Sequence, residues 1–124
     1  MGKKIKAKKV NHAKKLINDV SLASKVLDIK IYISGPVTGK AGFNIDKFTY
    51  QAERLRSFGL IVLNPMERHG HTDKSWFFYI LDDIRWIAVE KPKYFFMLKG
   101  WEYSHGAVIE HEVALKMGAK IFYE

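Results

Sequence analysis

The chain has 124 residues, of which 48% are hydrophobic and 27% are charged, and this composition fits one globular domain rather than two. It contains no cysteine, which excludes disulfide bonds, thiol catalysis and thiolate metal sites. No apolar run approaches the roughly 20 residues that span a bilayer, and the amino terminus lacks the apolar block of a secretory signal. We therefore expect a cytoplasmic protein that does not contact a membrane.

Most of the net charge of +8 lies in the first part of the chain. Residues 1–30 contain nine lysines and two aspartates, a net charge of +7, whereas residues 31–124 carry a net charge of only +1. The sequence therefore predicts a basic arm over residues 1–28 and an almost neutral domain over residues 29–124.

The second half of the arm has the pattern of a short amphipathic helix. Its apolar side chains recur with roughly helical spacing: Leu16, Ile17, Val20, Leu22 and Val26. Such an arm can bind the phosphate backbone of a nucleic acid, or it can be a solvated tail with a helix that docks on the domain or on a partner subunit. The arm has no aromatic side chain for stacking on bases, which favours the second interpretation.

Strand and helix patterns alternate through the rest of the chain. Strand-like runs cover residues 30–34, 60–63, 94–98 and 120–123, and helical periodicity covers residues 45–58, 76–89 and 107–117. This alternation predicts an α/β fold: a single-domain, Rossmann-like (flavodoxin-like) parallel sheet of four to five strands with flanking helices. In such sheets ligands bind at the carboxyl ends of the strands, which points to the loops after Ser34, Leu63 and Leu98.

The first of these loops runs from Gly35 to Lys40. Its backbone N–H groups and the Thr38 hydroxyl can hold an anion, although an ordinary tight turn has the same composition. A Walker loop is excluded because only three residues separate the two glycines, and Ala41 stands where Ser or Thr is needed.

Two acidic side chains stand side by side in the helix predicted over residues 76–89. Adjacent carboxylates on a helix point in different directions, so at most one of Asp82 and Asp83 faces the ligand site. The periodicity does not choose between them, and a solvated acidic surface is the alternative.

The loop after the third strand leads into a helix that carries a further carboxylate. Ser104 can cap this helix, whose first free N–H groups can donate hydrogen bonds to a phosphate, and Glu110 lies one turn beyond Gly106. His105 and His111 lack the spacing of a zinc-binding pair, so we expect neither a metal nor an organic cofactor.

These segments together resemble the nucleoside 2-deoxyribosyltransferase-like superfamily, and most closely its DUF4406 branch, which is common in bacteria and their phages. The resemblance covers residues 29–124. It rests on Ile31-Tyr-Ile-Ser-Gly-Pro-Val-Thr-Gly39, on Asn64-Pro65, on Asp83-Ile-Arg85, and on Gly100-Trp-Glu-x-Ser-x-Gly-Ala-x-x-Glu-His-Glu-x-Ala114.

The resemblance assigns roles to residues of this chain. It implies that Glu110 is a covalent nucleophile, that Tyr32 orients it, and that Asp83 helps to protonate the departing base. It also implies that the 5′-phosphate of a nucleotide is bound by Gly35, Pro36, Val37, Thr38, Ser104 and Gly106. Trp101 is a candidate for a wall against which the base stacks.

We therefore expect an enzyme that hydrolyses or transfers the N-glycosidic bond of a nucleoside 5′-monophosphate or nucleoside. Relatives carry another Asp just before the central strand, where this chain has residues 89–93 without one. The first alternative is thus a nucleotide-binding protein without fast turnover, such as a sensor or a phage accessory factor. The second is a nucleic-acid-binding protein that acts through residues 1–28.

The resemblance also implies a homodimer or larger homo-oligomer. The aromatic side chains exceed what a core of this size readily hides: Trp76, Phe77, Phe78, Tyr79, Trp86 and Trp101. We expect some of them at a subunit interface, while a larger core with a base-stacking wall is the alternative.

Overall fold

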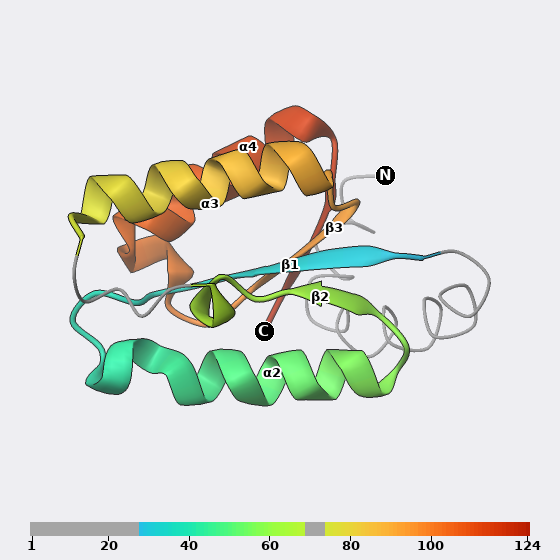
Figure 1. The fold of residues 1–124 in the computed structure, drawn as a ribbon, viewed down its shortest axis with the longest axis horizontal. Coiled ribbons are helices and arrows are strands. Elements are labelled where there is room, and N and C mark those ends of the chain that lie inside the picture. The colour runs from blue at the N-terminus through green and yellow to red at the C-terminus, as the bar shows by residue number, and fades with distance from the viewer. Residues whose placement is uncertain (1–27, 69–73) are drawn as a thin grey trace, which may run out of the picture.

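The protein is described here from a computed structural model that places residues 28–68 and 74–124 (Figure 1). The predictions made for the arm therefore lie outside the described residues, apart from Asp28. The elements in chain order are β1 (Lys30–Ser34), η1 (Ala41–Asn44), α2 (Ile45–Ser57), β2 (Ile61–Leu63), η2 (Pro65–Glu67), α3 (Trp76–Glu90), β3 (Tyr94–Met97), η3 (Trp101–Tyr103), α4 (His105–Met117) and β4 (Lys120–Tyr123).

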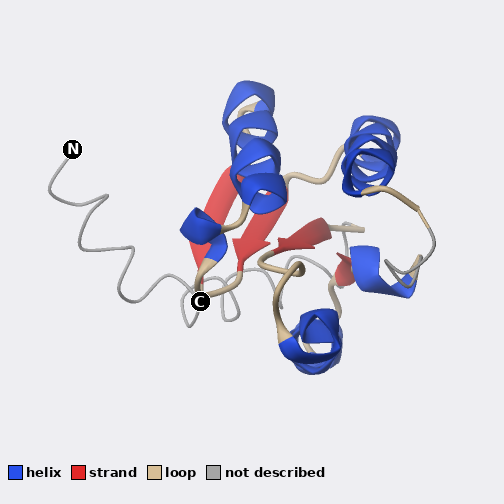
Figure 2. Ribbon diagram, turned by 90° about the vertical axis from the view of Figure 1, so that its left-hand side faces the viewer, coloured by secondary structure: helices blue, strands red, loops and turns tan. Residues whose placement is uncertain are grey.

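The four strands of the described ranges form one parallel sheet in the order β2-β1-β3-β4. Helix α2 covers one face of the sheet, and α3 and α4 lie together on the other (Figures 1 and 2). The expected α/β, Rossmann-like architecture is confirmed.

Alternation along β1 divides the core between the two faces. Ile31 and Ile33 pack with α2 residues such as Phe48 and Leu55. Tyr32 points to the opposite face, where it packs with side chains of α3, β3 and α4. Successive side chains of a strand leave opposite faces, so Ser34 lies on the Tyr32 side, beneath α3 and α4.

The observed ends of the helices differ from those predicted by periodicity where a capping residue determines the first turn. Helix α4 begins at His105 rather than at residue 107, because Ser104 is its N-cap and the Ser104 Oγ accepts a hydrogen bond from Ala107 N at 3.3 Å. Helix α3 is capped in the same way by Ser75, whose Oγ accepts from Phe78 N at 3.2 Å. The three short 3-10 turns had no periodic signal that would have predicted them.

The strand order places the candidate site. The chain leaves β1 toward β2 on one side, and then crosses back so that β3 lies on the other side of β1. Loops that follow two such neighbouring parallel strands diverge to opposite faces, which opens a crevice at their carboxyl ends.

Candidate active site

A narrow crevice lies at the carboxyl end of β1, between the amino-terminal halves of α3 and α4. Its volume is about 40 Å³. It is lined by Gly35, Val37, Thr38, Trp76, Tyr79, Ile80, Asp83, Ser104, Gly106, Ala107 and Glu110. The fold thus brings most of the predicted site residues to one place, from three separate segments of the chain.

Glu110 is buried at this crevice, with only 5% of its surface exposed. Tyr32 Oη donates a hydrogen bond to Glu110 Oε2 at 2.8 Å, and Ser34 Oγ donates to Glu110 Oε1 at 2.6 Å. Each carboxylate oxygen is therefore held by a hydroxyl group from β1.

Asp83 is the second buried carboxyl group of the crevice, also 5% exposed, and its charge acts on Glu110. Its neighbour Asp82 instead accepts a hydrogen bond from Arg68 Nη2 at 2.8 Å near the surface. The structure thereby settles what periodicity left open: Asp83 faces the site, and Asp82 forms an ion pair beside it.

Burial raises the pKa values of both carboxyl groups. The pKa of Glu110 rises to about 8, first through loss of hydration and then through the charge of Asp83, against the opposing hydrogen bonds from Ser34 and Tyr32. The pKa of Asp83 rises to about 7, first through burial and then through the charge of Asp82. Near neutral pH the pair therefore shares protons rather than carrying two full charges.

The hydroxyl group of Tyr32 stays protonated beside this pair. Burial, followed by the charges of Glu110 and Asp83, raises the pKa of Tyr32 well above its ordinary value of 10. Tyr32 is fully buried and its ring packs against those of Trp86 and Phe95, with centroid separations of 6.1 and 5.3 Å. The ring is thus fixed, and its hydroxyl can act only as a donor to Glu110 or to a ligand.

The loop after β1 passes very close to the chain that follows β3. Leu98 N donates a hydrogen bond to Ser34 O at 2.7 Å, and a Cβ atom added at Gly35 would lie 2.6 Å from Leu98 Cβ. Gly35 is therefore required by close approach. Val37 and Thr38 follow at the crevice, whereas the buried Pro36 does not line it and its carbonyl accepts a hydrogen bond from Asn44 Nδ2 at 2.9 Å.

Ser104 and Gly106 form the opposite wall at the start of α4. The Ser104 hydroxyl accepts from the helix backbone, which leaves its proton available to donate to a ligand. A Cβ atom at Gly106 would lie 3.2 Å from Ile80 Cδ1 and 3.6 Å from Trp76 Nε1, so this glycine lets α3 approach α4 closely.

Trp101 does not line this crevice, contrary to the expectation of a base-stacking wall. Its ring stacks on His111 with a centroid separation of 4.2 Å, and the His111 Nε2 lies 2.8 Å from Tyr123 Oη. The turn that carries Trp101 directs the ring toward the outer side of α4. Trp76, which is 43% exposed, is the tryptophan that lines the crevice.

Ser34 was not predicted as a site residue, and Trp76 was named only among the aromatic side chains expected at a subunit interface or in a base-stacking wall. Ser34 stands two positions after Tyr32 on the same strand, so period-two alternation was enough to place both hydroxyl groups on one face. Trp76 had no comparable signal, because its position depends on how the first turn of α3 meets Gly106.

Within residues 28–68 and 74–124 there is no cluster of three His, Asp or Glu side chains suited to a metal ion. Across the same ranges, no helix has the length and apolar character needed to cross a bilayer.

The aromatic side chains at the start of α3 differ in exposure: Phe77 and Phe78 are 61% and 48% exposed, while Tyr79 is buried.

Comparison with known proteins gives one assignment. No curated protein and no solved structure matches the chain. The model of the family described as "Domain of unknown function (DUF4406)" matches residues 29–123, which includes every side chain at the crevice. The chain, a parallel α/β domain with a buried pair of carboxyl groups at its strand ends, therefore belongs to the DUF4406 family.

Proposed function

We propose that this protein breaks the N-glycosidic bond of a nucleoside 5′-monophosphate through a covalent intermediate on Glu110. The observation that supports this most directly is the buried Asp83–Glu110 pair, in which two hydroxyl donors hold one member and the other lies beside it. Paired carboxyl groups that share protons are the usual machinery for cleaving a bond at an anomeric carbon.

In the first step a carboxylate oxygen of Glu110 forms a bond to the anomeric carbon, while the bond from that carbon to the base nitrogen breaks. The electron pair of the broken bond goes to the base, which takes a proton from Asp83. This step requires Glu110 to be ionised and Asp83 to be protonated. The hydrogen bonds from Tyr32 and Ser34 stabilise the ionised Glu110 and oppose the effect of burial, which raises the pKa of Glu110 to about 8, above the value of about 7 for Asp83.

In the second step Asp83, now a carboxylate, takes a proton from water. The oxygen of that water attacks the anomeric carbon, and the bond to Glu110 breaks with its electrons returning to the carboxylate. If a second base attacks instead of water, the same intermediate gives transfer rather than hydrolysis. The double displacement retains the configuration of the sugar.

The phosphate group is proposed to bind between the loop after β1 and the start of α4. Thr38 and Ser104 present hydroxyl groups there, and the first N–H groups of the 13-residue helix α4 favour a negative charge. The crevice of about 40 Å³ is far smaller than the roughly 300 Å³ or more of pockets that enclose ligands. It therefore accommodates the reacting edge of the sugar, while the base extends outward past the exposed ring of Trp76.

The proposal predicts release of free base from a nucleoside 5′-monophosphate, measured by chromatography over a panel of ribo- and deoxyribonucleotides. Glu110→Ala should lower the rate at least a thousandfold, because the nucleophile is lost, and Asp83→Asn should lower it about a hundredfold or more. Glu112→Ala, an exposed carboxylate on the same helix, is the matched control and should leave the rate unchanged.

A 2′-fluoro nucleotide analogue tests the intermediate itself. The fluorine destabilises the positive charge that develops on the sugar, so a glycosyl group should accumulate on the Glu110 peptide and be detected by mass spectrometry. Base release that survives Glu110→Ala would overturn the assignment of the nucleophile. Tight nucleotide binding by calorimetry, without release of base, would instead support a nucleotide-binding or sensor protein.

A further inference from the structure

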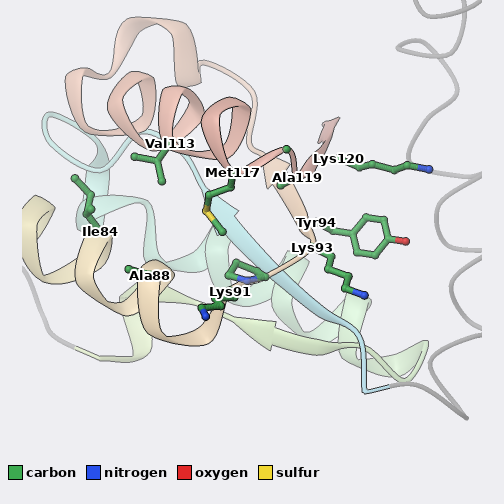
Figure 3. Close-up of a pocket in the computed structure, with 11 residues that line it drawn as sticks. Ile84, Ala88, Lys91, Lys93, Tyr94, Val113, Met117, Ala119 and Lys120 are labelled. Atoms are coloured by element: carbon green, nitrogen blue, oxygen red, sulfur yellow. The ribbon is translucent and has the colours of Figure 1, made fainter.

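A large depression lies between the same two helices, on the side away from the proposed active site. It is a groove of about 690 Å³ between the carboxyl-terminal halves of α3 and α4, at the amino-terminal end of the sheet. Figure 3 shows Ile84 and Ala88 on the α3 side of this groove and Val113 and Met117 on the α4 side. These pairs are each four residues apart, so both helices present a continuous apolar stripe to the groove.

The point at which the chain enters β1 adjoins this groove. A second depression, of about 490 Å³, is lined by Asp28, Ile29 and Lys30 together with Lys91 and Lys93. Both of these lysines also line the groove. Any segment that precedes Asp28 is therefore tethered within a few residues of the apolar stripe.

The segment just before Asp28 has an apolar pattern that suits the groove, which is also lined by Lys91, Lys93 and Lys120. Leu16, Val20, Ala23 and Leu27 occupy positions i, i+4, i+7 and i+11, which lie along one face of a helix. Between residues 16 and 27 the only charged side chains are Asp19 and Lys25, so the segment is neutral, unlike the lysine-rich residues before it. Twelve residues in a helix extend about 18 Å.

We propose that residues 16–27 of this chain occupy the groove between α3 and α4. An isolated helix of this length is barely stable in water, and burial of its apolar face against the stripe is what would fold it. Tethering at Asp28 gives the segment a local concentration on the order of millimolar, which favours it over a second copy of the protein at micromolar concentration.

Disulfide scanning tests the proposal directly, because the chain has no cysteine of its own. Ala88→Cys, near the end of the groove that adjoins Asp28, is held constant in the full-length protein and combined with single cysteines at positions 23 and 27, or at positions 21 and 25. Under mild oxidation the first set should form intrachain disulfides at least tenfold faster than the second, since only the first set faces the groove. Thr49→Cys, exposed on α2 across the sheet, replaces Ala88→Cys in the matched control and should show no such periodicity.

Hydrogen exchange gives a second readout that does not depend on a disulfide. The amides of residues 16–27 should be protected at least tenfold in the native protein, and Val113→Glu should abolish that protection by placing a charge in the groove. Equal cross-linking at all positions, or exchange at the rate of a free peptide, would overturn the proposal. The same oxidation is repeated on a mixture of isotopically light and heavy chains, in which disulfides between chains give mixed dimers. If all the disulfides join two chains, the proposal is overturned in favour of a second copy in the groove.

Discussion

Glu110 is held by two hydroxyl groups that differ in their surroundings. Tyr32 is locked by neighbouring rings, and Ser34 has the shorter hydrogen bond, 2.6 Å to Glu110 Oε1. Both bonds lower the pKa of Glu110, while burial and the charge of Asp83 raise it to about 8. The ionisation of this single side chain is thus a balance between hydrogen bonding and loss of hydration.

Removing the Ser34 hydroxyl should shift that balance. In Ser34→Ala the pKa of Glu110 rises further, because one of the two hydrogen bonds that stabilise its carboxylate is gone. The carboxyl carbon of Glu110, followed by NMR through a pH titration, should report the shift. Ser57→Ala is the control, because the Ser57 hydroxyl donates to Arg54 O at the surface of α2 and should leave the titration of Glu110 unchanged.

Replacing Glu110 by Gln should change how stability depends on pH. A carboxyl group whose pKa is higher in the folded state contributes stability that is complete below its unfolded pKa, near 4.5, and is lost as the pH rises through about 8. Glu110→Gln has no group that titrates at this position and so does not lose this stability as the pH rises. The free energy of unfolding of the variant minus that of the wild type should therefore increase by a few kcal/mol between pH 5 and pH 9, at about 1.4 kcal/mol per pKa unit.

Urea unfolding at the two pH values measures this difference. Glu112→Gln, on the exposed side of the same helix, should follow the wild type. An identical pH dependence for wild type and Glu110→Gln would show that Glu110 does not titrate in this window.

At the scale of elements, the contact between the loop after β1 and the chain after β3 fixes the floor of the crevice. A side chain at Gly35 has no room, because Leu98 is fully buried and its Cβ atom is part of the rigid backbone frame. Gly106 is tight as well, but its nearest neighbour is the flexible end of Ile80.

Replacing each of these two glycines by alanine should therefore lower the free energy of unfolding by different amounts. Gly35→Ala should lower the free energy of unfolding by about 1–3 kcal/mol or more, because the 2.6 Å contact forces backbone or core to shift. Gly106→Ala should cost less, since Ile80 can move and alanine is the better helix former by up to about 1 kcal/mol. Chemical denaturation of both variants provides the comparison, and an equal loss would contradict the close approach at Gly35.

The sequence predicted the elements well where a long periodic pattern was present. The strand at residues 30–34 and the helix beginning at Trp76 lie where alternation and helical spacing placed them. Capping moved the start of α4 back to His105, and the choice between Asp82 and Asp83 required knowledge of what α3 packs against. The position of the Trp101 ring depended on a non-repetitive turn, which periodicity does not describe.

At the scale of the whole molecule, the two features proposed to bind something lie at opposite ends of the same pair of helices. The crevice uses Asp83 and Glu110, and the groove begins at the next residue of α3, Ile84, and at Val113 on α4. An occupant of the groove would therefore contact the same two helices that carry both carboxyl groups. The two proposals nevertheless have separate tests, because cross-linking to Ala88→Cys requires no catalysis.

The hydrogen bonds to Glu110 have a consequence for how the site can select a ligand. Tyr32 and Ser34 come from a buried strand, and Glu110 from a packed helix, so none of the three depends on an exposed loop for its position. The three side chains are preorganised, so little side-chain entropy remains to be lost at these positions when a ligand binds. Selectivity at the reacting carbon should then come from the shape of a rigid frame, and adaptation should be confined to the parts of a ligand that extend beyond it.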